Sequence, residues 1–457
     1  MRALFLSSLQ PPRPGVDVHG IYKRLALHIR ALRALGAAIE IVYYVTEHDV
    51  PPGSSLSEAA AQQAAIDSDY WGVPIGVHFI RRRIRSNSFK DYYLRGIARA
   101  AEQPAFAPWA GPEQAEEVGR IVDSGPDLVL TMDLHVTCAL MRSGRRPRRL
   151  IVDLDDVQHL VRWRWCRQKP LTPGKLLMLS HIPALLAAER RAAREAEAML
   201  VCSTLDRGHL ARLGFQRLHI LPNAVDIPPD PPGPGEAPTL LFVGGMGHWP
   251  NEEAAERMVK QIFPRVLAKH PDATLVIAGK GSDTLPSRAA NPRNVEYLGF
   301  VRDLDPLIAR TAVFVCPMLN GGGTRIKLLD AAAHALPIVS TRMGVEGLDL
   351  VDGRDALLRD GDDEFAAACL ELLADPARRR RLGLAARAVI AAEYDAAAVQ
   401  ARLETLFAPH DAASRPASQE HESIVAAQQG RNQSWNTCSQ SPSSAPCSTQ
   451  RASMLRR

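Results

Sequence analysis

Cationic side chains and glycines gather between residues 320 and 330, where the chain reads Asn-Gly-Gly-Gly-Thr-Arg-Ile-Lys-Leu-Leu-Asp. The glycines 321–323 allow the backbone to approach a ligand closely. Arg325 and Lys327 then place two positive charges at the start of a predicted helix, where cations oppose the helix dipole. Free N–H groups at a helix start favour an anion. The pattern therefore predicts a binding site for an anionic group such as a phosphate.

Strand and helix signals on both sides indicate how this cluster is held. Residues 312–316 read as a buried strand, and Thr324 is the predicted N-cap of a helix that runs to about residue 335. Pro337 ends that helix and opens another apolar strand. Asp330, farther along the helix, is placed to accept hydrogen bonds from hydroxyl groups. A ligand with phosphates at one end and a sugar at the other suits this set. The plainer alternative is an ordinary turn with solvated basic residues.

A second cluster follows the apolar segment 150–154, where residues 153–159 read Asp-Leu-Asp-Asp-Val-Gln-His. Side chains at the carboxyl end of a strand in a parallel sheet reach the ligand-binding edge. A carboxylate or imidazole there can take a proton from a hydroxyl group or stabilise growing positive charge. We select Asp155 and His159 as catalytic residues, with Asp156 nearly as suitable. His135, expected on the preceding strand, is a weaker candidate, and a structural cap is the alternative role.

The stretch from Gly321 to Thr341 resembles the nucleotide-sugar site of retaining glycosyltransferases with two Rossmann-like domains, the group 1 or family 4 enzymes of GT-B type. Their turn reads Gly-x-Gly-Thr-Arg-x-Lys-x-Leu-Glu and is followed by a small-residue helix and a Leu-Pro-Val-Val-Ser-Thr strand. This chain has Asp330 in place of the ribose-binding Glu. It has Gly322 where many relatives have another Glu. The resemblance is strong over residues 239–407 and absent after residue 408.

The resemblance implies donor-binding roles in both halves of the chain. The loop after the first strand faces the donor diphosphate in the family, and Gly20 stands at its end. The backbone at Val301 matches a segment that meets the nucleotide base. The family's Arg and Lys after Gly244 are missing, so the phosphate charge should fall to Arg325 and Lys327. The expected donor-binding residues are Gly20, Gly244, Gly245, Gly279, Val301, Gly322, Gly323, Thr324, Arg325, Lys327 and Asp330.

Strand and helix signals alternate along most of the chain, which predicts an α/β fold with parallel sheets. We expect two Rossmann-like domains that face each other across a cleft. Residues 1–228 form the acceptor-side domain, and residues 229–238 form a linker rich in Pro and Gly. Residues 239–392 form the nucleotide-sugar-binding domain, and residues 393–407 a helix that returns to the first domain. The Ser-, Gln- and Pro-rich residues 408–457 are predicted to be disordered.

Composition narrows the class of protein. The 457 residues can form two large cores, and 46% hydrophobic with 23% charged residues is ordinary for a globular protein. A net charge of +5 is too small for a dedicated nucleic-acid binder. The seven cysteines contain no CxxC pair, which favours a reducing compartment and no structural metal. We expect no signal peptide and no membrane-spanning helix.

One segment nevertheless suits a membrane surface. Residues 162–169 alternate Trp with Arg and Lys, and residues 176–186 are largely apolar. Tryptophan favours the membrane interface and basic residues favour anionic head groups. Residues 162–186 therefore predict peripheral contact with an anionic membrane, and an acceptor-side loop with a packing helix is the alternative. We expect the protein to be cytoplasmic and, through this contact, peripheral at the inner face of the membrane.

The expected function is transfer of a sugar from a nucleoside diphosphate to a hydroxyl group of a glycan or glycolipid, with retention. We expect no metal and no cofactor, because no Asp-x-Asp pair lies near the donor turn. A sugar-nucleotide epimerase of the same build and a non-catalytic sugar- or membrane-binding protein remain alternatives. A nicotinamide-dependent oxidoreductase is disfavoured because residues 279–284 lack the third glycine of Gly-x-Gly-x-x-Gly. The base, the sugar and the acceptor are left open.

Overall fold

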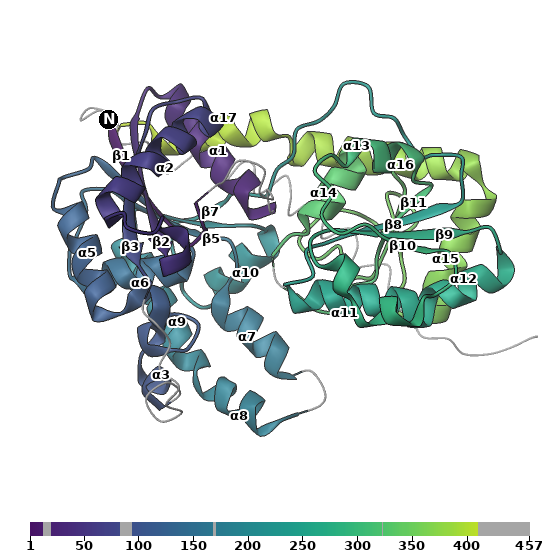
Figure 1. Cartoon of the computed structure of the whole chain (residues 1–457), viewed down its shortest axis with the longest axis horizontal. Coiled ribbons are helices and arrows are strands. Elements are labelled where there is room, and N and C mark those ends of the chain that lie inside the picture. The colour runs from purple at the N-terminus through teal and green to yellow at the C-terminus, as the bar shows by residue number, and fades with distance from the viewer. Residues whose placement is uncertain (12–19, 83–93, 168–170, 322, 410–457) are drawn as a thin grey trace, which may run out of the picture. The chain divides into compact units, whose positions relative to one another are not determined.

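The computed structural model describes residues 1–11, 20–82, 94–167, 171–321 and 323–409. Two parallel β-sheets with helices packed against them lie between Met1 and Ala408 (Figure 1). The predicted α/β class with two Rossmann-like sheets is confirmed. We predict disorder for residues 408–457, and all of these except 408 and 409 lie outside the described residues.

The first sheet has seven parallel strands in the order β3-β2-β1-β4-β5-β6-β7. Parallel strands that are covered on both faces are nearly continuous apolar runs, and every residue of β4 and β5 is buried. The strands are β1 (Arg2–Ser7), β2 (Ala38–Val45), β3 (Ile75–Arg81), β4 (Leu128–Met132), β5 (Leu150–Leu154), β6 (Ala198–Val201) and β7 (Leu218–Ile220).

The order of the strands reverses between β1 and β4, which pair with Ala3–Ser7 opposite Leu128–Met132. Open parallel sheets bind ligands at the carboxyl ends of the strands beside such a reversal. Ser8 and Asp133 directly follow these two strands. The fold therefore places both residues at the edge where a ligand is expected.

The helices of the first domain are α1 (Gly20–Ala34), α2 (Leu56–Trp71), α3 (Arg95–Ala98), α4 (Ala107–Ala110), α5 (Pro112–Val122), α6 (Leu134–Ser143), α7 (Gln158–Arg167), α8 (Pro173–Ser180), α9 (Ile182–Glu195) and α10 (Thr204–Arg212). The sequence predicts His135 on a strand, and this is wrong because α6 begins one residue earlier. No described helix is long and apolar enough to span a bilayer.

The second sheet repeats the same topology with six parallel strands in the order β10-β9-β8-β11-β12-β13. Its strands are β8 (Thr239–Val243), β9 (Thr274–Ala278), β10 (Val295–Tyr297), β11 (Val313–Cys316), β12 (Ile338–Ser340) and β13 (Leu357–Leu358). Its helices are α11 (Trp249–Arg257), α12 (Phe263–Lys269), α13 (Asp305–Arg310), α14 (Ile326–Ala333), α15 (Asp362–Ala374) and α16 (Pro376–Glu393). Its reversal lies between β8 and β11, so the turns after these strands form the second ligand-binding edge.

The last described helix, α17 (Ala396–Phe407), packs against α1 of the first domain. Val399, Leu403 and Phe407 are buried in the same core cluster as Phe5. The guanidinium of Arg149 donates to the last carbonyls of the helix, at 3.0 Å from that of Phe407 and 2.9 Å from that of residue 408. These bonds satisfy carbonyl groups that a helix end leaves open.

Removal of residues 410–457 is expected to leave the melting temperature unchanged within about 1 °C, because this Ser- and Gln-rich segment has little apolar surface to bury. The cut is placed after residue 409 to keep the carbonyls that Arg149 binds. Phe407→Ala is the positive control, since loss of a buried Phe costs about 3–5 kcal/mol. Calorimetric melting of both variants checks the prediction, and a drop of several degrees in the truncated chain would contradict it.

Candidate active site

The glycine turn predicted to bind phosphate lies at the carboxyl edge of the second sheet, between β11 and α14. The helix starts one residue later than predicted, because its N-cap is Arg325 and not Thr324. The hydroxyl of Thr324 instead accepts a hydrogen bond of 2.9 Å from the Asn223 side chain of the first domain. Gly322 lies outside the described residues.

Lys327 lies on the first turn of α14, and its side chain reaches the residues that follow β8. Its ammonium donates to Asn251 Oδ1 at 2.6 Å and lies 4.6 Å from the centre of the Phe242 ring. A Cβ atom at Gly244 would come within 2.9 Å of Lys327 Nζ, so a glycine is needed there to leave space for the ammonium. Burial and the charge of Arg325 lower the pKa of Lys327 to about 8. No ion pair joins this ammonium to a carboxylate of the described residues.

Arg325 lies beneath the same turn and is only 6% exposed. It donates to the carbonyl of Gly323 and, at 3.4 Å, to that of Met343. Burial lowers the pKa of this guanidinium, which nevertheless stays protonated at neutral pH. Both predicted phosphate-binding cations therefore lie at the turn and not on an outer surface.

Asp330 lies on the second turn of α14 and meets the first domain. Its carboxylate accepts from the ammonium of Lys23 at 2.5 Å. Lys23 stands on the first turn of α1, which begins at the predicted residue Gly20. The sequence predicts that the carboxylate of Asp330 is open to the hydroxyl groups of a ligand. In the structure, Lys23 of the first domain already contacts this carboxylate.

The other predicted donor-binding residues of the second domain lie in loops that follow its strands. The carbonyl of Gly245 accepts from Asn251 Nδ2 at 2.9 Å. Gly279, after β9, contacts the backbone of Gly244. Val301 lies on the loop after β10 and packs partly against the core of the second domain. The structure thus brings Gly244, Gly245 and Gly279 together with Lys327, whereas Val301 has no described contact with them.

Asp155 lies at the carboxyl edge of the first sheet, and the partners of its carboxylate belong to the same domain. Its carboxylate oxygen Oδ1 lies 3.3 Å from the thiol of Cys202 and 3.8 Å from the guanidinium of Arg24. Arg24 is buried and also binds Asp153 at 2.6 and 2.8 Å. Burial raises the pKa of Asp155 despite the charge of Arg24. The carboxylate of Asp155 therefore belongs to a buried network and has no described contact with the glycine turn, where only the backbone oxygen of Asp155 comes near, 3.7 Å from the place of a Cβ atom at Gly323.

Asp156 is the carboxylate that meets the glycine turn. A Cβ atom at Gly323 would stand 2.8 Å from Asp156 Oδ1, and Gly323 has a φ of +61°, which favours glycine. Burial and the charges of Asp155 and Asp133 raise the pKa of Asp156 to about 7. At neutral pH this carboxyl group can therefore either accept or donate a proton at the turn.

Asp133 is a residue that the sequence analysis did not select. It follows β4 with φ 78° and ψ 149°, a conformation that costs a residue other than glycine about 1–3 kcal/mol. The hydroxyl of Ser8 donates to its carboxylate across the reversal point of the sheet. Burial and the charge of Asp155 raise the pKa of Asp133 to about 7. The sequence signal that could have identified Asp133 is its position as an acidic residue directly after a buried strand.

His159 is buried and both of its ring nitrogens have partners. Nδ1 bonds to the carboxylate of Glu189, and Nε2 lies 2.9 Å from Nε2 of His209. His159 therefore has no ring nitrogen available for a substrate in this conformation. His135 is half-buried and stacks on Phe106 with 4.2 Å between ring centres, and desolvation lowers its pKa to about 4.

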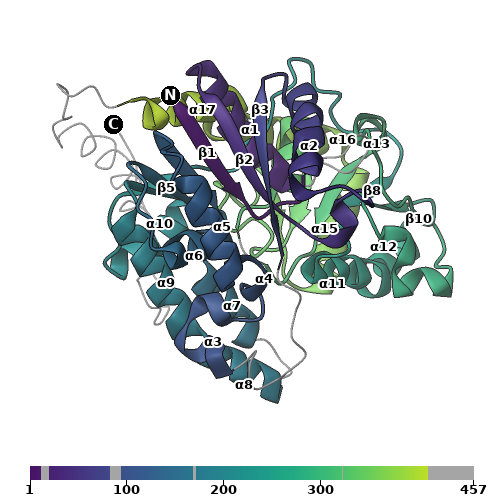
Figure 2. The ribbon, with the colours of Figure 1, turned by 60° about the vertical axis from the view of Figure 1, so that its left-hand side comes forward.

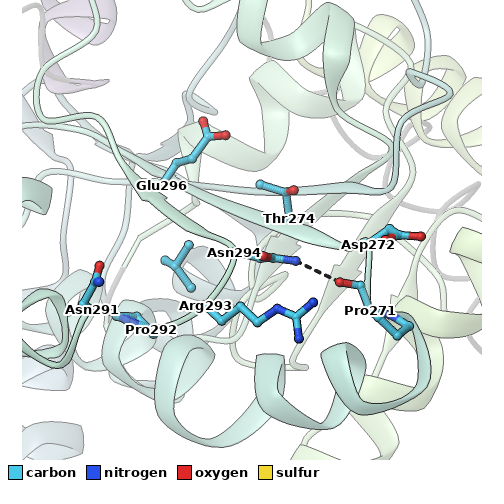
Figure 3. A pocket seen from close by; sticks show the side chains of 9 residues that line it. Pro271, Asp272, Thr274, Asn291, Pro292, Arg293, Asn294 and Glu296 are labelled. Atoms are coloured by element: carbon cyan, nitrogen blue, oxygen red, sulfur yellow. Dashed lines mark hydrogen bonds between the residues drawn. The ribbon is translucent and has the colours of Figure 1, made fainter.

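A cavity of about 650 Å³ lies at the opposite edge of the second sheet (Figure 3). It is lined by residues 271, 272 and 274, at the start of β9, and by residues 291–296, at the start of β10. Asn294 donates to the carbonyl of Pro271 at 2.9 Å in its wall. The glycine turns follow the carboxyl ends of the strands, so this cavity is separate from the candidate active site.

Comparison with known proteins supports a sugar-transferring site. Residues 237–375 match the family model "Glycosyl transferases group 1". The chain is 26% identical over 352 residues, 68% of its length and 91% of the relative's, to the GDP-mannose-dependent alpha-(1-6)-phosphatidylinositol monomannoside mannosyltransferase of Mycolicibacterium smegmatis. It is 28% identical over 228 residues to the glycogen synthase of Mycobacterium tuberculosis, covering 46% of this chain and 53% of the synthase.

The fold is shared with solved glycosyltransferases. The sucrose-phosphate synthase of Thermosynechococcus elongatus superposes with a TM-score of 0.62 at 16% identity, covering 93% of this chain and 100% of that one. The two parallel sheets therefore have the GT-B fold of these enzymes. Residues 237–375 carry a group 1 glycosyl transferase domain, so the chain is a glycosyltransferase.

Proposed function

We propose that the enzyme transfers a hexose, with retention, from a nucleoside diphosphate sugar to a hydroxyl group of a lipid-linked acceptor. The observation that carries this proposal is the ammonium of Lys327, held between Asn251 and Phe242 beside the glycine turn. The group has no described carboxylate partner, so an incoming diphosphate supplies the missing negative charge. Such fixed cations stabilise the charge that develops on a departing diphosphate.

No metal ion is needed in this proposal. Arg325, Lys327 and the start of α14 lie at one turn and together oppose the charge of the diphosphate. Of the residues predicted to bind the donor, those at this turn and at the neighbouring glycine edge would hold the diphosphate, with the ribose next to the Lys23–Asp330 pair. Metal independence would appear as full transfer activity in the presence of a chelator.

Carboxyl groups of the first domain would act on the sugar side of the turn. Asp156 contacts Gly323, and the charges of Asp133 and Asp156 influence one another. A carboxyl group with a pKa near neutral pH is suited to exchange a proton with a hydroxyl group. We therefore place Asp156 at the reacting sugar, with Asp133 next to it and Asp155 supporting both from the buried network.

GDP-mannose is the first donor to test, because the mannosyltransferase similar along most of this chain uses it by name. A phosphatidylinositol mannoside is the matching first acceptor. The experiment incubates the full chain with a panel of labelled nucleotide sugars and follows release of nucleoside diphosphate and labelled lipid. Transfer to the lipid supports the proposal. An isomerised donor without release would indicate an epimerase, and binding without turnover would indicate a non-catalytic binder.

We also propose that α3, α7 and α8 form the surface that meets the membrane. These helices lie at the same end of the first domain in both views (Figures 1 and 2). Trp163, Leu171 and Leu176 are 45%, 61% and 59% exposed, and no residue of α8 is buried. The sequence contains no Asp or Glu from residue 157 to residue 188. Exposed apolar side chains within a basic segment suit an anionic bilayer.

The double variant Leu171→Ser and Leu176→Ser is expected to bind phosphatidylglycerol vesicles at least about tenfold more weakly, because each buried Leu contributes about 1.5–3 kcal/mol. Co-sedimentation with vesicles measures the change. Leu384→Ser, at a residue 58% exposed on α16, is the matched control and should bind like the unmodified protein. Equal binding of phosphatidylcholine and phosphatidylglycerol vesicles would contradict the role of the basic residues.

A further inference from the structure

Two arginines of the first domain form no ion pair with a carboxylate of the described residues. Arg82 directly follows β3, and its guanidinium donates from Nε to the carbonyl of Tyr44 at 3.0 Å. Arg162 stands on α7, and its one described hydrogen bond goes to the sulfur of Met178 at 3.1 Å. A guanidinium has five N–H donors, and a thioether is a weak acceptor. Both arginines are therefore poorly satisfied within the described chain.

Two aromatic side chains connect these arginines. The guanidinium of Arg82 lies over the ring of Trp109, 4.7 Å from its centre. The ring centres of Trp109 and His135 are 5.3 Å apart. Desolvation and the charge of Arg162 lower the pKa of His135, so these two side chains are neighbours as well. Arg82, Trp109, His135 and Arg162 therefore form one continuous cluster, which we call the arginine cluster.

The arginine cluster contains many hydrogen-bond donors and few acceptors. Nε1 of Trp109 and Nδ1 of His135 are buried and have no hydrogen-bond partner in the described part of the chain. An indole N–H and a guanidinium can only donate, and a neutral imidazole donates from one of its nitrogens. The carboxylate of Asp49 attracts Arg82 from beyond ion-pair distance and is bonded to Thr46. A ligand that completes the cluster therefore carries negative charge and several acceptor oxygens.

The arginine cluster lies on the edge of the first sheet where a ligand is expected. Arg82, His135 and Arg162 stand on the segments that follow the carboxyl ends of β3, β4 and β5. His135 is two residues from Asp133, which we place next to the reacting sugar. Arg162 is followed on α7 by Trp163, which we place at the membrane surface. The cluster therefore borders both the proposed reaction centre and the proposed membrane surface.

We propose that Arg82, Trp109, His135 and Arg162 form a binding site for the phosphate group of the acceptor. Two arginines from different elements can each donate a pair of hydrogen bonds to a tetrahedral phosphate, whereas a carboxylate offers only two oxygens. The site deepens the proposed function and rests on it, since the acceptor is the lipid-linked molecule that receives the sugar. A lipid head group and free phosphate share this chemistry, and the experiment distinguishes them.

Titration calorimetry of the full chain with dihexanoyl phosphatidylinositol, kept below the concentration at which it forms micelles, tests the site without any sugar transfer. The double variant Arg82→Gln and Arg162→Gln should bind this phospholipid at least about tenfold more weakly, because charged hydrogen bonds are lost. The matched control is Arg33→Gln with Arg146→Gln, which removes the same charge. Arg33 and Arg146 are exposed and precede β2 and β5, at the opposite edge of the sheet, so their loss should leave affinity unchanged.

Trp109→Phe is a second variant that keeps the inference testable if the double arginine variant folds poorly. It keeps a ring beneath Arg82 and removes the N–H group. We expect folded Trp109→Phe to bind the phospholipid several-fold more weakly, because an indole donor is lost. Melting curves show whether each variant is folded. Unchanged phospholipid affinity in the folded variants would overturn the inference.

Two further probes identify the source of the phosphate. Dihexanoylglycerol lacks a phosphate and should not bind measurably, and equal binding of this neutral lipid would overturn the site. Inorganic phosphate should compete with the phospholipid and bind more weakly. Tighter binding of inorganic phosphate would overturn the assignment to an acceptor and indicate a site for the free anion.

Nucleoside diphosphate binding separates this inference from the proposed function. The double arginine variant should bind a nucleoside diphosphate like the unmodified protein, because the glycine turn belongs to the second domain. Phospholipid binding through the arginine cluster in a protein that transfers no sugar would count against the proposed function alone. An active enzyme whose phospholipid affinity does not depend on the cluster would count against this inference alone.

Discussion

Lys327→Ala and Arg325→Ala are each expected to weaken nucleoside diphosphate binding by about 1.5–3 kcal/mol, or roughly 10- to 150-fold, which is the range for hydrogen bonds to charged groups. The reason is geometric as well as electrostatic. Both cations lie at the glycine turn, and Lys327 Nζ occupies a space that Gly244 leaves open. Titration calorimetry with a nucleoside diphosphate measures the loss.

The pH dependence of the same titration gives a second check. The pKa of Lys327 is about 8 in the free protein, and a bound phosphate raises it. The ammonium's contribution to affinity is therefore complete below about pH 8 and is lost as the pH rises through the higher value of the complex. Lys327→Ala should remove this dependence.

Lys260→Ala is the matched control for these two variants. Lys260 belongs to the same domain, is exposed, and pairs with Glu256 at 2.6 Å. Its removal should leave affinity unchanged, because an exposed ion pair contributes little and lies away from the turn. If Arg325→Ala and Lys327→Ala both bound like the Lys260 variant, the phosphate assignment would be wrong.

Asp156→Asn is expected to lower kcat by about 10²–10⁴-fold, the usual contribution of a positioned acid or base. Nucleoside diphosphate affinity should change little, because the side chain meets the turn from the sugar side in the proposed arrangement. The expected loss follows from the contact of Asp156 with Gly323 and from a pKa near 7. Steady-state kinetics with the donor identified in the panel separates kcat from KM.

Asp155→Asn provides the contrast. Because Asp155 interacts with Cys202 and Arg24 inside the first domain, we expect its replacement to affect the melting temperature more than the rate of transfer. The opposite result, an inactive but stable Asp155→Asn together with an active Asp156→Asn, would return the catalytic role to the residue first chosen from the sequence.

Much of the scaffold follows from local sequence alone. β5 begins and ends at the predicted residues 150 and 154, because strands buried on both faces form a nearly continuous apolar run. β3 was not predicted, since its residues are only partly buried and its basic end resembles a solvated face. Asn251 lies inside α11, which a π-helical turn at Met258–Ile262 separates from α12, and the Asn251 side chain accepts from Lys327.

The sequence alone determined the α/β class, the order of strand, glycine turn and helix, and the presence of two cations at the turn, because these depend on neighbours along the chain. Only the tertiary structure decided that the carboxylate of Asp156, and not that of Asp155, lies beside Gly323. It also decided that Glu189 and His209 enclose His159 and that Lys23 reaches Asp330. Those contacts join residues far apart in the chain or depend on the direction of a single side chain. Packing of distant elements fixes that direction, and no local pattern encodes it.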